Sequence, residues 1–512
     1  MEYPSTPLIL WIFKFIQMPS LKAFLAKAYA AIIYKKINKW SSKPLETQNH
    51  VFQSLISEAV STNFGVDHDF ISIKSYEDFV NRVPVRDYEA LRPYVDKVVA
   101  GESNVLWKGK PLYFAKTSGT TSGAKYIPIT KESMPGHVEA AKNAILLYIH
   151  QTGNTQVVDQ KMIFLQGSPV LEIINGVQLG RLSGIVAHYV PKYLQKNRLP
   201  SWETNCIEDW ESKVNKIVQE TLNEDMSIIA GIPSWVQMYF EKLVAIKDKK
   251  VGDIFKNFNL FIFGGVNYEP YRSKFESLIG RKVNTIELYP ASEGFFAFQD
   301  NQNETGMLLQ LNSGIFYEFI CAETFFEPNH KRLTLKDVEV GVNYVIIIST
   351  TAGLWAYNIG DTIEFTSTKP YRVIVSGRIK HFISAFGEHV IGKEVEQAMQ
   401  EATLNSNVRI SEFTVAPQIS PKEGLPYHEW FIEFENEPEN LSALAKKIDE
   451  SLQKQNSYYF DLIKGGVLQP LKITKVKHGG FQEYMKSIGK LGGQNKLPRL
   501  SNDRKIVEGF LS

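Results

Sequence analysis

Short apolar runs alternate with longer helical patterns through the middle of this 512-residue chain, and this alternation most limits the folds it can adopt. Strand-like runs at 161–165, 227–230 and 260–263 are interleaved with helical patterns, notably 131–150 and 210–222. Strands that alternate with helices favour a largely parallel sheet with helices packed on its faces. The middle of the chain therefore predicts an α/β layered architecture.

The flanking regions have a different pattern. Helical patterns at 8–40 and 48–63 form a lead-in to the central region. After residue 306 the helical periodicity gives way to short strand-like runs, at 314–321, 343–349, 362–365 and 371–375. This change predicts a β-rich subdomain attached to the α/β core.

The last part of the chain predicts a separate small α+β domain. Beyond residue 377 the pattern gives helices at 392–402 and 441–454, and strands at 412–416, 428–435 and 471–476. A chain of 58.2 kDa is too long for one ordinary core. We expect a large domain over 1–376, a smaller one over 377–512 and a hinge near 376–380.

Composition narrows the functional classes. The formal net charge is only +2 and both signs are spread along the chain, which argues against non-specific nucleic-acid binding. Cys206 and Cys321 have no metal-binding or redox-pair spacing, which favours a reducing cytoplasm. The apolar stretch 8–18 carries Lys14 and is too short to span a bilayer. It is interpreted as a packed helix, with an interfacial anchor as the alternative. We expect a monomer without stable membrane insertion.

A loop rich in hydroxyl groups and glycine, "TSGTTSGAK" over 117–125, lies between two hydrophobic strand patterns. Glycines let a backbone approach an anion closely, hydroxyls and N–H groups donate to phosphate oxygens, and Lys125 adds a positive charge. The spacing is not that of a Walker A loop, which excludes the usual P-loop kinases and GTPases. The loop indicates phosphate binding, although a plain surface loop is the alternative.

Four ordered segments resemble the auxin-responsive acyl-acid amido synthetases, the Gretchen Hagen family of the adenylate-forming superfamily. "TSGTTSGAKYIPIT" is similar to the first nucleotide motif, "LYPASEGFFAF" (288–298) to the second, "GLWAYNIGDTIEF" (353–365) to the third, and "GGQNKLPRL" (492–500) to the family's ending. The chain looks like a bacterial-type member. The resemblance implies a large multilayered adenylation domain over 1–376 and a mobile lid domain over 377–512.

The resemblance also assigns a set of site residues. Glu293 is the implied Mg²⁺ ligand, Asp361 the ligand of the ribose hydroxyls, and Lys496 the catalytic cation between the carboxylate and the α-phosphate. Without the resemblance, Glu293 and Lys496 would be interpreted as solvated surface charges. The implied nucleotide-binding residues are Thr117, Ser118, Gly119, Thr120, Thr121, Gly265, Val266, Tyr289, Ala291, Ser292, Tyr357, Asp361, Arg378 and His389.

Two positions depart from the family pattern. Asn358 stands where plant members usually carry Arg, and His389 follows Glu388 where many plant members have Lys after Asp. Arg378 lies in the segment that resembles the hinge. We expect His389 to replace the lysine.

These features predict a ligase that uses ATP and Mg²⁺ to convert a carboxylic acid to its acyl-adenylate and then transfers the acyl group to an amine. We expect this amine to be an amino acid. An acid:CoA ligase and a non-catalytic nucleotide-binding protein are the alternatives. The absence of a nucleophile elbow agrees with direct attack on the adenylate. The sequence does not identify the acid, although His137, Gln166 and Arg181 are polar groups in the region expected to select it.

Overall fold

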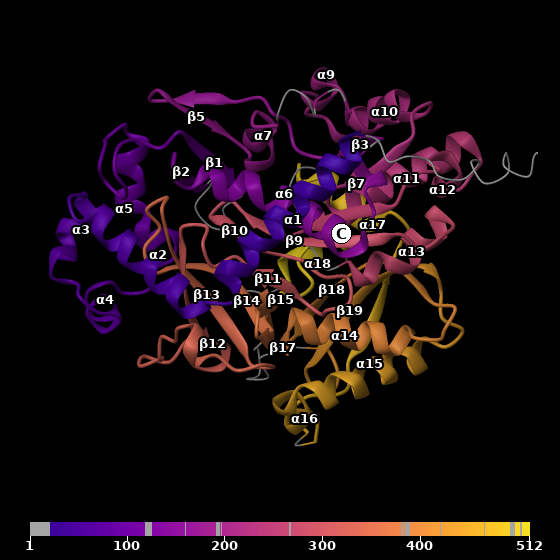
Figure 1. Cartoon of the computed structure of the whole chain (residues 1–512). Coiled ribbons are helices and arrows are strands. Elements are labelled where there is room, and N and C mark those ends of the chain that lie inside the picture. Colours follow the sequence, from indigo (N-terminus) through magenta and orange to yellow (C-terminus); the bar gives the residue numbers. More distant parts are fainter. Residues whose placement is uncertain are drawn as a thin grey trace, which may run out of the picture.

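The computed structural model describes residues 21–117, 125–158, 160–190, 195, 197–265, 268–379, 382–383, 390–419, 421–464, 466–491, 497–501 and 504–511. Its larger part is built on an 11-stranded sheet with the strand order β12-β13-β14-β15-β11-β10-β9-β8-β7-β3-β6 (Figure 1). The parallel half comprises β3 (Lys161–Phe164), β6 (Arg198–Leu199), β7 (Met226–Ala230), β8 (Leu260–Gly264) and β9 (Asn284–Ala291). The predicted α/β architecture with a parallel sheet is confirmed.

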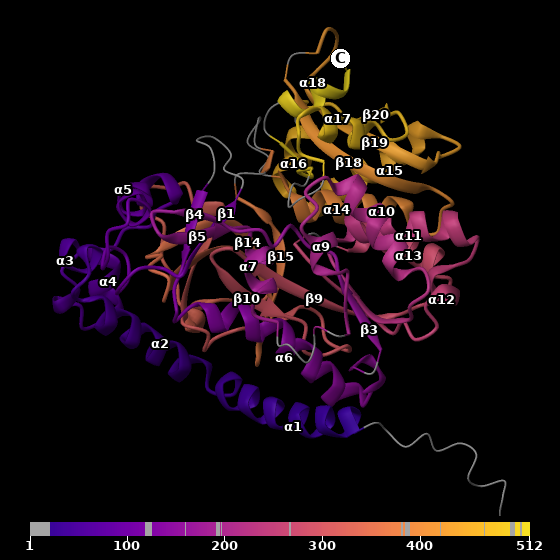
Figure 2. The same ribbon diagram turned by 90° about the horizontal axis from the view of Figure 1, so that it is seen from above.

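Alternate residues of the parallel strands face opposite layers of helices. On β8, Phe261 and Phe263 pack in the cluster with α11 (Pro233–Lys247) and α13 (Glu269–Ile279). Leu260 and Ile262 pack on the other face, in the cluster with α6 (Met134–Thr152) and α1 (Leu21–Ser41). A strand covered on both faces is apolar throughout, which explains the continuous apolar runs of the sequence. Figure 2 shows α1 and α6 on one side of the sheet and α11 and α13 on the other.

The remaining helices of the larger part frame this sheet. They are α2 (Pro44–Ala59), α3 (Asn63–Asp67), α4 (Tyr76–Arg82), α5 (Tyr88–Val99), α7 (Leu182–Ala187), α9 (Trp202–Asn205), α10 (Trp210–Thr221) and α12 (Val251–Ile254). None of the helices in the described part of the chain is both long and apolar enough to cross a membrane.

The β-rich region continues the same sheet. Its strands are β10 (Gly294–Phe298), β11 (Met307–Leu309), β12 (Ile315–Cys321), β13 (Asn343–Thr350), β14 (Tyr357–Thr368) and β15 (Tyr371–Arg378). They join the parallel half because β9 pairs with β8 in parallel on one edge and with β10 antiparallel on the other. The strand expected at 362–365 is longer than predicted and begins at Tyr357.

A second, smaller sheet has the order β2-β1-β5-β4. Its strands are β1 (Tyr113–Thr117), β2 (Lys125–Ile129), β4 (Glu172–Ile174) and β5 (Val177–Gly180). β1 and β2 are antiparallel, with Thr117 opposite Lys125, as the predicted order of strand, loop and strand requires.

The C-terminal unit has its own core. β18 (Arg409–Gln418), β19 (Tyr427–Asn436) and β20 (Lys472–Val476) form a three-stranded sheet against α14 (Gly392–Thr403) and α15 (Leu441–Gln455). This confirms the predicted small α+β unit. The prediction did not include α16 (Ser457–Lys464), α17 (Gly480–Ser487) and α18 (Lys505–Leu511), which are short helices. A two-stranded ribbon, β16 (Phe382–Ile383) and β17 (Val390–Ile391), precedes α14. The boundary at 376/377 stays a prediction.

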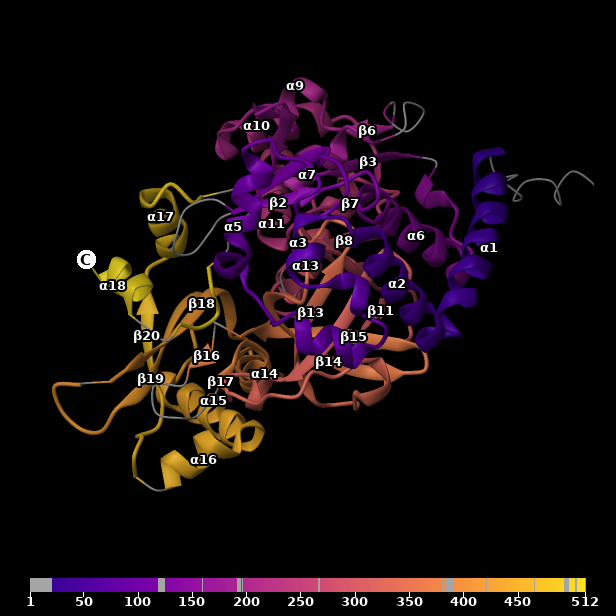
Figure 3. The same ribbon diagram turned by 90° about the vertical axis from the view of Figure 1, so that its left-hand side faces the viewer.

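The C-terminal unit packs on α13, at the end of the molecule opposite α1 (Figure 3). The hydroxyl of Tyr271 on α13 donates to Glu412 on β18 over 3.3 Å. One turn further along α13, Lys274 forms a 2.8 Å ion pair with Glu435 on β19. These two polar contacts join the C-terminal unit to α13.

Glu287 on β9 gives this region a pH-dependent stability. Burial, followed by repulsion from Glu269 and Glu396, raises the pKa of Glu287 to about 7. A carboxyl whose folded pKa is raised costs stability as pH rises from its unfolded pKa, about 4.5, through 7. We expect Glu287→Gln to be more stable than the parent protein at pH 8 by ~1–3 kcal/mol, and equally stable near pH 4. Urea unfolding at the two pH values measures this; an equal loss of stability with pH in both proteins would contradict it.

Candidate functional site

The candidate site lies where the parallel half of the sheet meets the antiparallel half. In open α/β sheets, ligands bind at the carboxyl ends of parallel strands near such a change of direction. β8 and β9 end side by side here, with Gly264 opposite Leu288. A Cβ on Gly264 would lie 2.5 Å from the Leu288 carbonyl oxygen, so only glycine allows this close approach. Gly265 follows with a φ of +81° and takes the chain out of the sheet beside Tyr289 and Pro290.

A tight turn at Ser292 and Glu293 connects β9 to β10. Ala291 pairs directly with Gly294 across this turn. A Cβ on Gly294 would lie 2.6 Å from Ile315 Cδ1, so the glycine lets the turn pack against β12. Ser292 is buried and Glu293 is half-buried. This turn fixes the Glu293 carboxylate at the carboxyl end of β9.

Asp361 lies on a bulge inside β14. β13 pairs Val345 with Thr362 but Ile347 with Asn358, so three residues of β14 oppose a single residue of β13. Gly360, with a φ of +88°, allows this irregularity. Bulges re-aim side chains next to active sites. This one places Asp361 opposite Arg378 on β15.

Asp361 connects the two motif segments through hydrogen bonds. Its Oδ2 accepts a 2.8 Å bond from the hydroxyl of buried Tyr289, and its Oδ1 accepts a 2.7 Å bond from Arg378 Nε. Burial, and then the Asp361 charge, raises the pKa of Tyr289 well above its usual value, so the tyrosine remains a donor. The Asp361 charge raises the pKa of Arg378. The two hydrogen bonds fix the orientation of the Asp361 carboxyl group.

Glu293 shares the electrostatic environment of this group. Burial, and to a lesser extent Asp361, raises the pKa of Glu293, whereas Lys125 and Arg378 oppose the increase. Tyr357 is buried nearby, and after burial the Glu293 charge contributes most to its raised pKa. The structure therefore brings together Tyr289, Ser292, Glu293, Tyr357, Asp361 and Arg378 from the predicted set, with Lys125 at the start of β2.

Asn358 has a local structural role. Its side-chain oxygen accepts a 2.8 Å hydrogen bond from the Gly360 backbone N–H. Its own N–H donates to the Arg86 carbonyl over 2.8 Å. At the position where plant members usually carry Arg, this asparagine therefore stabilises the bulge that carries Asp361.

Several predicted residues lie outside the described part of the chain. They are Ser118, Gly119, Thr120, Thr121, Val266, His389 and Lys496. Thr117 and Lys125 flank the first of these segments at the end of the β1–β2 hairpin. The residues after Lys496 run beside β18, where Val415 exchanges backbone hydrogen bonds with Arg499 and Ser501.

Sequence reasoning missed Tyr88 at the start of α5. The helix begins at Tyr88 after the Asp87 cap. This start lets the Tyr88 hydroxyl accept a 2.9 Å bond from the Tyr126 N–H, and Lys125 lies over the Tyr88 ring. The Asp87 cap, a strong helix-start signal, could have located the helix but not this contact.

The donor set fits a magnesium ion that is bound largely by its nucleotide. No group of three or more His, Cys, Asp or Glu side chains gathers as a metal cage among the described residues. Mg²⁺ usually takes one or two protein carboxylates and completes its shell with phosphate oxygens and water. Within the described residues Glu293 has no ion pair within 4 Å, and its raised pKa reflects a carboxylate that a cation would stabilise. Glu293 is thus a suitable single ligand.

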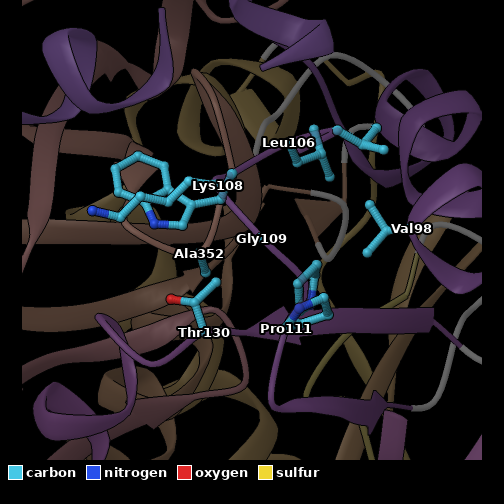
Figure 4. Close-up of a pocket in the computed structure, with 10 residues that line it drawn as sticks. Val98, Leu106, Lys108, Gly109, Pro111, Thr130 and Ala352 are labelled. Atoms are coloured by element: carbon cyan, nitrogen blue, oxygen red, sulfur yellow. The ribbon is translucent and has the colours of Figure 1, made fainter. Parts of the chain in front are cut away.

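The cavity drawn in Figure 4 is not part of this site. It lies between α5 and the 105–111 segment, is lined by Val98, Leu106, Pro111 and Thr130, and encloses about 10 Å³. This space holds roughly one water molecule and is too small for a nucleotide.

Comparison with known proteins identifies three matching family domains. Residues 33–170 match the GH3 family N-terminal domain, residues 308–378 the central domain and residues 393–505 the C-terminal domain. Among curated proteins, the 4-substituted benzoates-glutamate ligase GH3.12 of Arabidopsis thaliana is 21% identical over 565 residues, which cover 93% of this chain and 96% of that protein.

Two solved structures show the same architecture. The acyl acid amido synthetase AtGH3.15 in complex with 2,4-DB superposes with a TM-score of 0.77 at 17% identity, and covers 96% of this chain and 97% of its own. A 2-hydroxyisobutyryl-CoA ligase with bound 2-HIB-AMP has a TM-score of 0.56 at 14% identity, with 91% of each chain covered. At these identities the two structures support the fold.

Proposed function

We propose that this chain, which belongs to the GH3 family of acyl acid amido synthetases, uses ATP to activate a carboxylic acid as its acyl-adenylate and transfers the acyl group to an amino acid. The observation that carries this proposal is the convergence of Tyr289, Asp361 and Arg378 beside the Glu293 turn. These residues come from the second and third motif segments and from the end of β15. A nucleotide is the ligand that their chemistry fits.

Each of these side chains has a role in holding the nucleotide. Asp361 is acceptor-only in its ionised form, and its two oxygens suit the two ribose hydroxyls. Tyr289 and Arg378 fix the orientation of that carboxylate, and the 117–125 loop with Lys125 binds the phosphates. Mg²⁺, bound by Glu293 and the nucleotide, would supply charge neutralisation at the phosphates.

Lys496 acts at the reacting centre. An ammonium between the acid carboxylate and the α-phosphate offsets the repulsion of two anions as they meet. An oxygen of the acid carboxylate attacks the α-phosphorus and displaces pyrophosphate. The neutral amine nitrogen of the amino acid then attacks the acyl carbon, expels AMP and releases a proton. Rotation of the 377–512 domain about the 376–380 hinge would exclude water from the adenylate between the two steps.

The amide product is favoured over a thioester. The fold match to an acyl acid amido synthetase, with a TM-score of 0.77, exceeds the match to the CoA ligase, at 0.56. One relative of this chain is the 4-substituted benzoates-glutamate ligase, which joins an acid to an amino acid. We further propose that the enzyme is a cytoplasmic monomer; its two free cysteines suit a reducing compartment.

The test is exchange of labelled pyrophosphate into ATP with Mg²⁺, without acceptor, across a panel of aromatic, indole and fatty acids. Exchange that depends on one class of acid supports adenylation, and amino acids and CoA are then compared as acceptors. ATP binding without exchange for every acid would reject the proposal in favour of a non-catalytic nucleotide binder.

The ribose role of Asp361 predicts a binding defect. A charge-assisted hydrogen bond contributes about 1.5–3 kcal/mol, so Asp361→Asn should raise the KM for ATP ~10- to 100-fold with a smaller change in kcat. Steady-state exchange rates measured against ATP concentration give both constants. Asp337→Asn, a change of an exposed carboxylate in a 3₁₀ turn, is the control. An unchanged KM for ATP in Asp361→Asn would contradict the assignment.

A further inference from the structure

Three cationic side chains converge on Gln166 and Gly167, directly after β3. Arg198 donates to the Gln166 side-chain oxygen over 2.7 Å, and Lys213 on α10 donates to the Gln166 carbonyl over 2.9 Å. Arg181, just before α7, lies with its Cδ 3.2 Å from the position a Cβ on Gly167 would take. We call Arg181, Arg198 and Lys213 the cationic cluster.

No acidic side chain neutralises the cationic cluster within the described residues. None of its three members forms an ion pair within 4 Å, although 23 such pairs occur elsewhere in the described chain. Glu220, the carboxylate near Ser201, instead accepts hydrogen bonds from Ser201 and Thr204. A buried cation without a counter-ion, such as Lys213, is costly, which points to a functional use of the cluster.

Unpaired polar atoms gather at the same place. Gln166 Nε2, Arg198 Nε and Ser183 Oγ are buried hydrogen-bond donors without a partner in the described structure. Ser183 Oγ lies 3.3 Å from the Cβ position of Gly167. Burial lowers the pKa of Arg198 to about 10 and that of Lys213 to about 8, so both remain mostly charged at neutral pH. Positive charge combined with free donors fits an anionic group such as a carboxylate.

The position of the cationic cluster relates it to the nucleotide site. β3, β7, β8 and β9 are consecutive parallel neighbours in the sheet (Figure 1). Gln166, Gly265 and Ser292 follow β3, β8 and β9, so all three lie at the carboxyl ends of these strands. β3 and β9 are three strand spacings apart, which is a distance of about 14 Å. In an amino acid the amine and the α-carboxylate are attached to the same carbon atom. The α-carboxylate therefore cannot reach the cationic cluster while the amine attacks at β9.

We propose that the cationic cluster binds a second anionic group of the acyl acid, at the end remote from the carboxyl group that becomes adenylated. The preferred substrate class is therefore a doubly anionic acid, such as a long dicarboxylic acid. This inference rests on the proposed function and adds the substrate class to it. Arg181 is exposed and supplies the entry side, while half-buried Arg198 and buried Lys213 supply positive charge further inside.

The test compares α,ω-dicarboxylic acids of eight to twelve carbons with their monomethyl esters in the pyrophosphate exchange assay. We expect kcat/KM for the best diacid to exceed that of its ester at least ~10-fold, as one buried charge-assisted pair implies. Arg181→Gln and Arg198→Gln should each reduce the diacid to the level of the ester, and leave the ester within about twofold. Lys216→Gln, which removes an exposed charge from α10, is the matched control.

The outcomes separate this inference from the proposed function. Exchange with equal use of diacid and ester, or an equal loss of both in the arginine variants, overturns the inference and leaves adenylation intact. A rise confined to the KM for the amino acid assigns the cluster to the acceptor and also overturns it. If no acid supports exchange, the proposed function fails. The inference is then tested by thermal unfolding: the diacid should raise the melting temperature of the parent protein but not that of Arg181→Gln. This variant should fold because it changes an exposed side chain.

Discussion

The Glu293→Gln variant should lose at least ~100-fold of its acid-dependent pyrophosphate exchange and need much more Mg²⁺ to reach its maximum rate. Glu293 is held in the tight turn between β9 and β10, and its raised pKa shows that burial disfavours its charge. A carboxylate kept charged at such a cost suits a cation ligand, and glutamine has the same shape without that charge. Loss of charge stabilisation at the phosphates typically lowers rates by two to three orders of magnitude.

A structural role for Glu293 predicts the reverse pattern, in which the variant loses stability and its Mg²⁺ requirement stays unchanged. In the metal-ligand role, burial of the charge only costs stability, so the variant folds as well as or better than the parent protein and activity is the property that falls. A Mg²⁺ titration of the exchange rate, together with thermal unfolding, distinguishes the two roles. Glu304→Gln removes an exposed carboxylate on the loop after β10 and serves as the control. Parent-like exchange with an unchanged Mg²⁺ requirement would show that Glu293 is not the metal ligand.

Local sequence signals located the site because each motif sits on one element or turn. The Ser292–Glu293 turn is marked by Gly294 and by the apolar strand before it, and the β1–β2 hairpin is marked by its hydroxyl-rich loop. These features depend on residues close in sequence. Periodicity and turn chemistry therefore suffice to predict them.

The contacts between motifs could not be predicted in the same way. Tyr289 and Asp361 are 72 residues apart, and their hydrogen bond depends on how β14 aligns with β13. The bulge at Gly360 changes that alignment, and glycine in a strand pattern signals a bulge without giving the direction of the next side chain. For the same reason Arg378 was interpreted as part of a hinge, whereas it also pairs with Asp361.

The extent of the sheet was also beyond local reasoning. The change from helical to strand patterns after residue 306 predicted a β-rich subdomain attached to the core, but not that its strands extend the central sheet. The connection is made by one hairpin, β9–β10, at which the strand direction reverses. That reversal brings the second and third motifs together in one sheet. The same hairpin therefore determines both the extent of the sheet and the position of the site.

The Lys496→Ala variant should adenylate its acid ~10²- to 10³-fold more slowly and still bind ATP with nearly unchanged affinity. The ammonium is proposed to act on charge that develops between carboxylate and α-phosphate, which is absent when ATP alone is bound. Single-turnover formation of the acyl-adenylate and calorimetric titration with ATP measure the two properties separately. Lys490→Ala is the control, because it removes the same charge from an exposed side chain six residues earlier. A group that stabilises only the transition state must change the rate and not the binding of the nucleotide. Loss of ATP affinity in Lys496→Ala would therefore make the lysine a ground-state phosphate ligand. Near-normal adenylation would remove the lysine from the mechanism.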